Sequence, residues 1–335
     1  MNTYSSPVRV AIAGATGYAG QELLSLLVRH PEVHLVAAMS SSPDSAARPL
    51  PRLVRTWDGK VEPLDVARLK AEATFVFLAI PEAASAELAP DLLEAGVRVI
   101  DLSGAFRIVD DRQRAKWYPA TTVQPANVAY GLVEHNREAI RHAALVACPG
   151  CYPTAALLAL TPLMQAGLLD TSAGIIVDAK SGISGAGRSP SDRTHFSENH
   201  GSMAAYGVLG HRHVAEMEQA LGSEVTFVPH LVPLDRGILE TIYVKTVAGT
   251  SAEQINDALQ QAYASAPFVR LTGDALPEIK HVAWTNFCDI GWKFDAATRR
   301  LVLISCIDNL VKGAAGQAVQ NLNVICGFDE RTGLR

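Results

Sequence analysis

The N-terminal segment constrains the fold more than any other part of the sequence. Residues 8–13 have the apolar pattern of a buried strand, and they run directly into a loop with glycines at positions 14, 17 and 20 and an amphipathic helix. Gly14 permits a tight turn, Gly17 lets the backbone approach a pyrophosphate, and Gly20 allows close packing of helix on strand. The spacing is G-x-x-G-x-x-G, not G-x-G-x-x-G. We interpret it as a dinucleotide-binding loop, with a plain strand-to-helix turn as the alternative. The residues expected to contact the cofactor here are Gly14, Thr16, Gly17, Tyr18 and Gly20.

The end of the next apolar run bears on the choice of cofactor. Residues 33–39 lead into Ser40, Ser41 and Ser42, where an NAD-specific domain usually carries an acidic residue for the ribose 2′-hydroxyl. Small hydroxyl residues with Arg48 nearby suit a 2′-phosphate better. The segment therefore predicts NADP(H), and an ordinary serine-rich loop is the alternative.

Strand and helix patterns alternate through the first half of the chain. Apolar runs at 75–80 and 97–102 alternate with helical patterns, which predicts an α/β fold with a Rossmann-type, doubly wound parallel sheet. We expect this NADP-binding domain to comprise residues 1–150 with 308–335.

Extended segments dominate the second half of the chain. Strand patterns at 225–228, 239–247 and 300–307, with one helix at 252–264, predict an α+β catalytic and dimerisation domain with a mixed sheet over residues 151–307.

A cysteine motif marks the middle of the chain. Residues 143–146 form an apolar run, the stretch 147–154 with Cys148-Pro149-Gly150-Cys151 follows, and we expect a helix to begin at Cys151. Backbone N–H groups and the helix dipole favour an anion at a helix start, so the Cys151 thiol should have a pKa below its usual ~8.5 and act as a nucleophile. A C-x-x-C redox or metal pair with Cys148 and a buried structural cysteine are the alternatives.

Two further stretches carry chemistry. The loop from Ser181 to Arg188 is rich in glycines and hydrogen-bond donors, which fits either an anion or substrate pocket or a mobile connection. Four histidines, His195, His200, His211 and His213, then follow within a short span. A cluster of histidines can indicate a metal site, but a His-x-His pair without acidic or cysteine partners at ligand spacing is a poor zinc signature. We expect no metal and consider a catalytic acid/base or solvated, capping histidines.

Composition narrows the class of protein. The 335-residue chain is 48% hydrophobic, with net charge −5 and pI near 6.1, and it lacks the basic block that a nucleic-acid-binding protein needs. The N-terminus has no signal-peptide pattern, and no apolar run reaches the ~18 residues that span a bilayer. We expect a cytoplasmic protein without membrane or nucleic-acid partners, its five cysteines reduced.

Taken together, the motifs resemble the N-acetyl-γ-glutamyl-phosphate reductases, NADPH-dependent enzymes of the third step of arginine biosynthesis. The resemblance rests on 14–17, 149–151, 210–213 and 308–314. It extends to Ile100-Asp101-Leu102-Ser103, Phe106-Arg107 and Tyr130-Gly131-Leu132. The wider superfamily includes aspartate-semialdehyde dehydrogenase, and the Gly-His-Arg-His segment favours the acetylglutamyl enzyme.

The resemblance implies a reaction and a set of roles. The Cys151 thiolate would attack the acyl phosphate and form a thioester, a hydride from NADPH would reduce it to the semialdehyde, and His213 or His211 would carry the proton. Inorganic phosphate would leave. The implied substrate contacts are Ser181, Ser184, Gly185, Arg188, Arg107 and Tyr206, and the further cofactor contacts are Gly185 and Asn309. A homo-oligomer, dimer or tetramer, is also implied.

Three positions depart from the pattern of the family. Cys148 stands where Asn is expected, Glu82 where His is usual, and Ser42-Pro43 where Ser-Arg is usual, so the 2′-phosphate contact rests on Arg48 and the serines. The alternatives are aspartate-semialdehyde dehydrogenase, a non-catalytic NADP-binding sensor with an inert thiol, and a C-x-x-C thiol oxidoreductase.

Overall fold

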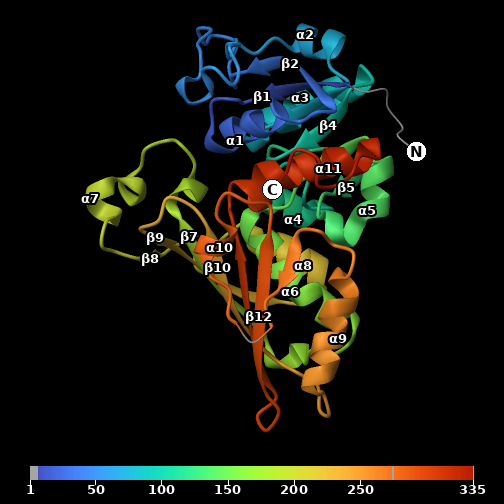
Figure 1. Ribbon diagram of the computed structural model, residues 1–335, viewed down its shortest axis with the longest axis vertical. Helices are drawn as coiled ribbons and strands as arrows, with labels where there is room; N and C mark the ends of the chain where they lie inside the picture. The colour runs from blue at the N-terminus through green and yellow to red at the C-terminus, as the bar shows by residue number, and fades with distance from the viewer. Residues whose placement is uncertain (1–6, 274, 335) are drawn as a thin grey trace. The chain divides into compact units, whose positions relative to one another are not determined.

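The computed structural model describes residues 7–273 and 275–334 (Figure 1). The chain forms two compact units, one comprising residues up to Pro149 together with Ala314–Arg335, the other comprising Gly150–Gly313. The sequence placed the boundaries after residues 150 and 307, so the segment 308–313, which includes Asn309, falls in the second unit. Each unit is built around its own sheet.

The first unit contains a six-stranded, fully parallel sheet with strand order β2-β1-β3-β4-β6-β5. Its strands are β1 (Val8–Ala13), β2 (Val33–Met39), β3 (Phe75–Leu78), β4 (Arg98–Asp101), β5 (Val128–Tyr130) and β6 (Leu145–Ala147). Its helices are α1 (Tyr18–Leu27), η1 (Pro51–Leu53), α2 (Val66–Glu72), α3 (Glu82–Glu94), α4 (Asp111–Trp117), α5 (Val133–His142) and α11 (Gly316–Cys326).

Successive residues of β1 face opposite sides of this sheet, as strand geometry requires. Val10 and Ile12 belong to a core with Leu23 and Leu24 of α1, while the intervening alanines of β1 pack in a second core with residues of α3. Burial on both faces explains why the strand reads as a continuous apolar run. The predicted doubly wound parallel sheet is confirmed.

The second unit contains a seven-stranded mixed sheet with strand order β11-β12-β13-β10-β7-β9-β8. Its strands are β7 (Ile175–Gly182), β8 (Ala204–Ala205), β9 (Val225–Val232), β10 (Ile238–Lys245), β11 (Val269–Leu271), β12 (Cys288–Asp295) and β13 (Arg300–Ile307). Its helices are α6 (Cys151–Gln165), η2 (Thr171–Ala173), η3 (Ile183–Ala186), η4 (Asp192–Thr194), α7 (Phe196–Asn199), α8 (His213–Leu221), α9 (Ala252–Tyr263) and α10 (Ile279–Val282). A π-helix, η5 (Val311–Ala315), ends this unit and begins the last part of the first.

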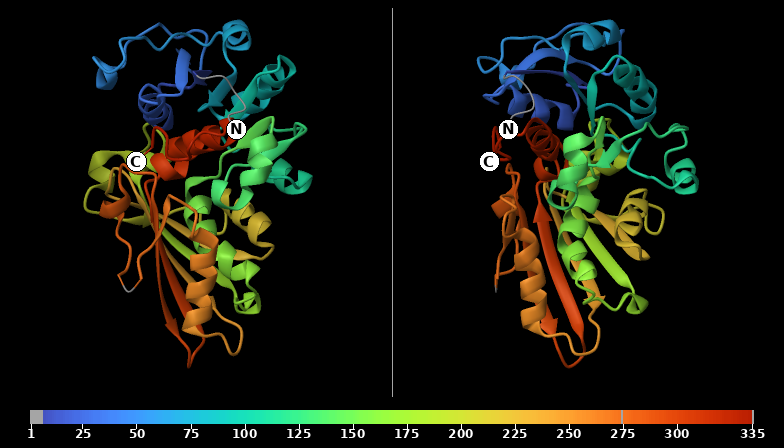
Figure 2. Two further views of the ribbon diagram at one scale, coloured as in Figure 1. Left: turned by 45° about the vertical axis from the view of Figure 1, so that its right-hand side comes forward. Right: turned by 90° about the vertical axis from the view of Figure 1, so that its right-hand side faces the viewer.

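The two faces of this mixed sheet differ in what covers them. Helix α6 packs on β10 and β13 (Figure 2), and the β10 residues on that face, such as Ile238 and Ile242, are fully buried. The opposite face carries the exposed cross-strand pair Ile176 and Tyr243. The predicted mixed sheet is confirmed. Across the described residues, no helix is long and apolar enough to cross a membrane.

Candidate active site

Cys151 is the first residue of α6, as the sequence predicts. Gly150 is the N-cap in an extended conformation, and its carbonyl oxygen accepts hydrogen bonds from both the backbone N–H and the hydroxyl of Thr154, each at 2.9 Å. The Cys151 thiol is unoxidised and half-buried. Cys151 therefore stands at the helix end where the backbone N–H groups have no partner within the helix, and it is only half-buried.

His213 lies directly against the turn that carries the cysteine. A Cβ added to Gly150 would come within 2.5 Å of the His213 Nε2 atom, so only glycine leaves room for the imidazole. Glu216, one helical turn on in α8, is fully buried and accepts a hydrogen bond from the Gly150 N–H at 2.9 Å. Its other oxygen lies 3.8 Å from His213 Nε2. One carboxylate thus holds both the turn and the imidazole.

Sequence reasoning missed Glu216. The signal was the His-x-x-Glu spacing at the start of a helix, because residues three apart lie on one helix face. That spacing says nothing of the contact with Gly150, which only the tertiary structure makes.

His211 lies in an aromatic cluster beside His213. Its ring packs edge-on against His213 at 4.7 Å, Tyr152 at 5.8 Å and Tyr206 at 5.6 Å between centroids. Burial, reinforced by the charge of Arg212, lowers the pKa of His211 to about 4. Its Nδ1 accepts a hydrogen bond from the His213 N–H at 3.2 Å, which fits a neutral ring. His211 is therefore neutral near pH 7.

The two tyrosines connect this cluster to the helix start. Their hydroxyls share a hydrogen bond of 3.0 Å, and burial raises the pKa of Tyr206 to about 12 and that of Tyr152 further. Both hydroxyls therefore stay protonated at neutral pH. Tyr206 therefore contacts Tyr152, the residue that follows Cys151.

Gly313 closes another side of the cysteine. A Cβ added there would lie 2.7 Å from the Cys151 Cβ, so this position also requires glycine. The neighbouring Lys312 is fully buried, with its Nζ 5.9 Å from the centre of the Phe268 ring. Gly313 of the late Lys-Gly-Ala segment therefore packs against the nucleophile candidate.

Asn309 ties the donor-rich loop to the same unit. Its side-chain Nδ2 donates to the Ser184 Oγ at 3.0 Å, and its Oδ1 accepts from the Gly237 N–H at 2.7 Å. A Cβ on Gly185 would lie 3.0 Å from the Ser181 Oγ, and Ser181 is itself 1% exposed. The structure therefore brings four predicted contacts, Ser181, Ser184, Gly185 and Asn309, into one group.

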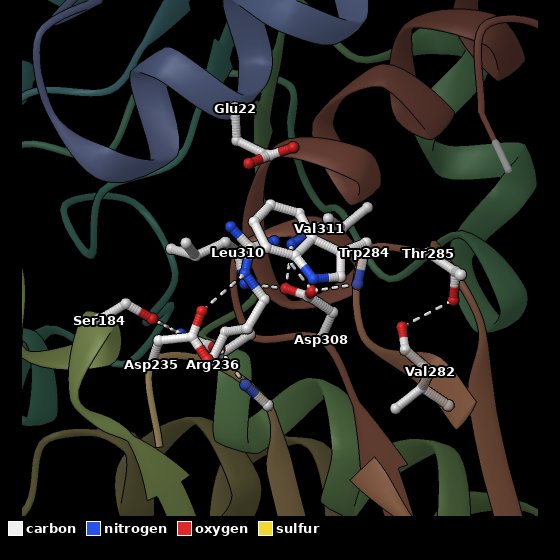
Figure 3. A network of polar contacts seen from close by, with 12 residues as sticks. Glu22, Ser184, Asp235, Arg236, Val282, Trp284, Thr285, Asp308, Leu310 and Val311 are labelled. Atoms are coloured by element: carbon white, nitrogen blue, oxygen red, sulfur yellow. Dashed lines mark hydrogen bonds and ion pairs between the residues drawn. The ribbon is translucent and has the colours of Figure 1, made fainter. Parts of the chain in front are cut away.

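Asp308 fixes the backbone on which Asn309 depends (Figure 3). Its Oδ2 accepts hydrogen bonds from Arg236 Nη1 at 3.0 Å and from the Trp284 backbone N–H at 2.6 Å. Its Oδ1 accepts hydrogen bonds from the backbone N–H groups of Leu310 and Val311. The Arg236 guanidinium lies 3.2 Å from the centre of the Trp284 ring. Trp284 has a φ of +67°, a strained conformation for a bulky residue that these contacts hold in place. Sequence reasoning gave Asp308, Arg236 and Trp284 no role in the site.

Three other predicted residues of the histidine and loop region have different surroundings. Arg188 is exposed, His195 is the N-cap of α7, and the His200 ring stacks on Phe196 at 4.8 Å between centroids. No cluster of three or more potential metal ligands occurs among residues 7–273 and 275–334.

In the first unit, the fold requires glycine at two positions of the glycine loop, and the third has space beside it. Gly14 has a φ of +95°, and a Cβ there would lie 2.2 Å from the Ala79 carbonyl oxygen. A Cβ on Gly20 would lie 2.1 Å from the Gly14 carbonyl oxygen. Gly17, the N-cap of α1, has an ordinary φ of −71° and no heavy atom within 3.7 Å of an added Cβ. The open space at Gly17 is what a closely approaching ligand needs. The loop and first turn also carry Thr16 and Tyr18.

The end of β2 lies beside this loop. The Met39 carbonyl oxygen accepts hydrogen bonds from two successive backbone N–H groups of the glycine loop. Residues 40–42 therefore begin next to it, with the buried Ser40 donating its hydroxyl to the Ser42 carbonyl at 2.7 Å, while Arg48 is exposed. The serine hydroxyls and the Arg48 guanidinium fit a nucleotide phosphate, while Asp44 follows two residues after Ser42 and donates its backbone N–H to the Ser42 Oγ at 3.2 Å.

Two other residues of the first unit bear on the predictions. Arg107 is nearly buried, and its Nη2 donates to the Leu102 carbonyl at 2.9 Å. Cys148 is buried, and desolvation, reinforced by the charge of Asp101, raises the pKa of its thiol to about 12. The Asn321 amide lies 3.7 Å from its sulfur. Cys148 is therefore a protonated core residue.

Comparisons with known proteins agree with this arrangement. Residues 9–143 match the family model of the semialdehyde dehydrogenase NAD-binding domain, and residues 151–309 match the model of the semialdehyde dehydrogenase dimerisation domain. Among solved structures, aspartate semialdehyde dehydrogenase II from Vibrio cholerae superposes with a TM-score of 0.74 at 23% identity, over 96% of this chain and 98% of that one. Identity at this level establishes the fold alone.

Sequence relatives are much closer. The N-acetyl-γ-glutamyl-phosphate reductase of Shouchella clausii is 45% identical and that of Desulforapulum autotrophicum 46% identical, each alignment covering 98% of both chains. Such identity over nearly the whole length shows that the chain belongs to the N-acetyl-γ-glutamyl-phosphate reductase family of semialdehyde dehydrogenases.

Proposed function

We propose that this chain reduces N-acetyl-γ-glutamyl phosphate to N-acetyl-L-glutamate 5-semialdehyde, with NADPH as reductant and inorganic phosphate as the second product. This is the third step from glutamate in arginine biosynthesis. The observation that carries the proposal is the half-buried Cys151 at the start of α6, with His213 and Glu216 against its turn. The names of the relatives support it.

Cys151 is the nucleophile. Its sulfur attacks the acyl carbon, the carbon–oxygen bond to the phosphate breaks, and a thioester remains. The helix N–H groups stabilise the anionic sulfur and the oxyanion that forms in the attack. Bound NADPH supplies the hydride that reduces the thioester carbon. The resulting thiohemiacetal then collapses, the carbon–sulfur bond breaks and the aldehyde leaves.

His213 carries the proton to the departing sulfur. It lies against the Gly150 turn, whereas His211 is held neutral by burial and packs on the tyrosines. A ring that is neutral down to about pH 4 cannot supply a proton as an imidazolium near neutral pH. His211 instead positions His213 by accepting its backbone N–H, and Glu216 holds the imidazole from the other side.

The donor-rich loop holds the substrate phosphate. Ser181, Ser184, Gly185 and Arg188 provide hydroxyl, backbone and guanidinium donors, and Asn309 fixes the loop through Ser184. Further contacts that we assign are Arg107 and Tyr206 to substrate and Gly185 and Asn309 to the nicotinamide end of the cofactor.

The cofactor is NADP(H), held by the glycine loop and the end of β2. The space at Gly17 accepts the pyrophosphate, and Ser40 to Ser42 with Arg48 accept the 2′-phosphate. If Arg48 reaches that phosphate, Arg48→Ala weakens NADPH binding much more than NADH binding. Fluorescence titration with both cofactors measures this, and an equal loss for the two would remove Arg48 from the phosphate site.

We further propose a homo-oligomer, a dimer or tetramer, working in the cytoplasm. The matched family model is a dimerisation domain, and the open face of the mixed sheet exposes Ile176 and Tyr243 as a direct cross-strand pair. Light scattering after size exclusion tests the assembly. A Tyr243→Lys variant should shift it toward smaller species.

One assay tests the activity. In the reverse direction, NADP⁺ reduction is followed with N-acetylglutamate semialdehyde and phosphate, with aspartate semialdehyde as the control substrate and NAD⁺ as the control cofactor. We expect phosphate-dependent NADPH formation with the acetylated aldehyde. Preference for aspartate semialdehyde would assign the chain to the other branch of the superfamily, and no turnover with either would indicate a non-catalytic binding protein.

A further inference from the structure

A groove separate from the site around Cys151 runs along one edge of the mixed sheet. It has a volume of about 570 Å³ and lies between helix α9 and strand β12, which run side by side in Figures 1 and 2. The helix contributes Glu253, Asn256, Asp257 and Gln260 to its lining, and the strand contributes Trp292 and Phe294. None of these residues belongs to the catalytic group. The groove therefore has one helical wall and one strand wall.

Strand β12 is paired along its whole length on one side only. Every residue from 288 to 295 pairs with β13, whereas β11 pairs with residues 288–290 alone. Among the described residues, no strand lies on the outer side of residues 291–295. The second half of β12 is therefore an edge strand.

The chain that follows β11 explains why this edge stays open. A Cβ added to Gly291 would lie 2.7 Å from Thr272 Oγ1 and from Pro277 Cδ, so the segment after β11 packs on the face of β12 to which Gly291 belongs. Successive residues of a strand face opposite sides, which places Trp292 and Phe294 on the other face, where α9 lies. The segment after β11 thus crosses to one face of the sheet and leaves the groove on the other.

The backbone at this edge points its hydrogen-bonding groups toward the groove side. The Ile290 carbonyl accepts a hydrogen bond from the Thr272 N–H at 2.9 Å, so the even-numbered residues of β12 present their N–H and C=O groups away from β13. Trp292 and Phe294 continue this series beyond the end of β11. Their outward N–H and C=O groups are those that an added extended chain would bond.

The side chains of the groove indicate the charge of its occupant. Glu253 and Asp257 are exposed, and neither carboxylate forms an ion pair within the described part of the chain. They lie four residues apart on α9, which is about 6 Å along the helix axis. Trp292 and Phe294 are half-buried aromatic residues beside them, while alternation turns the Lys293 side chain to the opposite face. Two carboxylates above two aromatic rings favour cationic side chains with apolar stems.

We propose that this groove binds an extended segment of a partner protein as an added strand on β12, with two basic side chains of that segment on Glu253 and Asp257. Alternate side chains of a strand are about 6.6 Å apart, which matches the spacing of the two carboxylates. A second copy of this chain fits less well. It would offer its own β12, whose side chains on the groove face, Trp292 and Phe294, carry no charge.

The test uses the full-length protein and a fluorescein-labelled peptide in which threonine and lysine alternate, with binding measured by fluorescence anisotropy. Three control peptides separate the contributions: one with glutamate in place of lysine, one with the two lysines adjacent, and one with a methylated backbone that lacks the N–H donors. We expect the alternating lysine peptide to bind more tightly than all three. Its affinity should fall as salt is added, because the carboxylates are exposed.

Variants of the helical wall test the charge. Glu253→Gln and Asp257→Asn should each lower the affinity for the lysine peptide by about two- to fivefold, the usual size for an exposed ion pair. Glu224→Gln is the matched control, because Glu224 is an exposed acid of the same unit outside the groove, and it should change nothing. Enzyme turnover should be the same in all three variants.

A variant of the strand wall tests the backbone. Phe294→Pro removes an N–H that faces away from β13, so the β12–β13 ladder keeps its hydrogen bonds. It should lower the affinity by about tenfold, whereas Phe294→Leu, which retains the N–H, should have a much smaller effect. Urea unfolding and enzyme turnover confirm that both variants are folded, and the methylated peptide tests the same bonds without any substitution.

The outcomes are decisive in both directions. Preference for alternating lysines, with losses in the two acid variants and in Phe294→Pro, supports the added strand. Equal affinity for the lysine and glutamate peptides, equal losses in Phe294→Pro and Phe294→Leu, or no peptide binding would overturn it. Binding of free lysine amide as tight as that of the peptide would indicate a small-cation site instead. A shift of Phe294→Pro toward smaller species in light scattering would assign the edge to a second copy.

Discussion

The two cysteines of the central motif give the sharpest test of acyl-enzyme chemistry. A dithiol mechanism requires both sulfurs, whereas a thioester mechanism requires Cys151 alone. We expect Cys151→Ser to abolish turnover with folding and NADPH binding retained, and Cys148→Ser to keep most of the activity, because Cys148 is a buried, protonated core residue.

The structure sets the size of the expected difference in thiol reactivity. Since the pKa of Cys148 is about 12, roughly 3 in 100,000 of its molecules are thiolate at pH 7.5. A thiol with the ordinary value of ~8.5 is about 9% thiolate at that pH, which is roughly three thousand times more. Burial also raises the pKa of Cys326 to about 12 and that of Cys306 further, and Cys288 is fully buried.

The assay is brief alkylation with iodoacetamide at pH 7.5, followed by peptide mass spectrometry. We expect label on Cys151 almost exclusively, and protection by N-acetylglutamate semialdehyde. The Cys148→Ser protein is the matched control and should label like the wild type. Label spread over several cysteines, or activity lost equally in the two serine variants, would refute the acyl-enzyme reasoning.

Three further outcomes are expected. Gly17→Ala should weaken NADPH binding at least tenfold with only a small loss in the free energy of unfolding from the poorer helix cap. Gly20→Ala should destabilise the protein much more, because its Cβ would lie 2.1 Å from a carbonyl oxygen; titration and urea unfolding measure the two effects. His213→Asn should lower kcat by ~10²–10⁴ and His211→Asn by less, as steady-state rates will show; the reverse ranking would reassign the proton carrier. Burial raises the pKa of Glu240 well above its ordinary value, and neither of its oxygens has a hydrogen-bond partner among the described residues. Its contribution to stability is therefore complete below about pH 4.5 and is lost as pH rises toward the folded-state pKa, at about 1.4 kcal/mol per pH unit. Urea unfolding from pH 5 to 8 should show Glu240→Gln gaining on the wild type, and a constant difference would argue against the burial effect.

Local sequence patterns were enough to predict the structural features that depend only on residues close together in the chain. The strand and glycine loop at Gly14 follow from apolar periodicity and from a backbone that needs a positive φ. The start of a helix at Cys151 follows from a turn sequence before an apolar helical pattern. Strand β12 (Cys288–Asp295) was not predicted, although apolar residues alternate along it, and its position in the sheet depends on pairing with β13.

The roles of individual site residues depend on contacts between distant parts of the chain. The sequence favours His213 over His211 only slightly, because a helix begins beside it, and packing separates them clearly: tyrosine rings bury His211, while His213 lies on Gly150. The sequence left a C-x-x-C pair of Cys148 with Cys151 as an alternative, and burial, reinforced by the charge of Asp101, raises the pKa of Cys148 and makes it a core residue. Glu216 gains its role from the Gly150 N–H, 66 residues away. Desolvation and hydrogen bonding act through space, so periodicity and motif spacing determine where the chemistry lies, while the tertiary structure determines which side chain performs it.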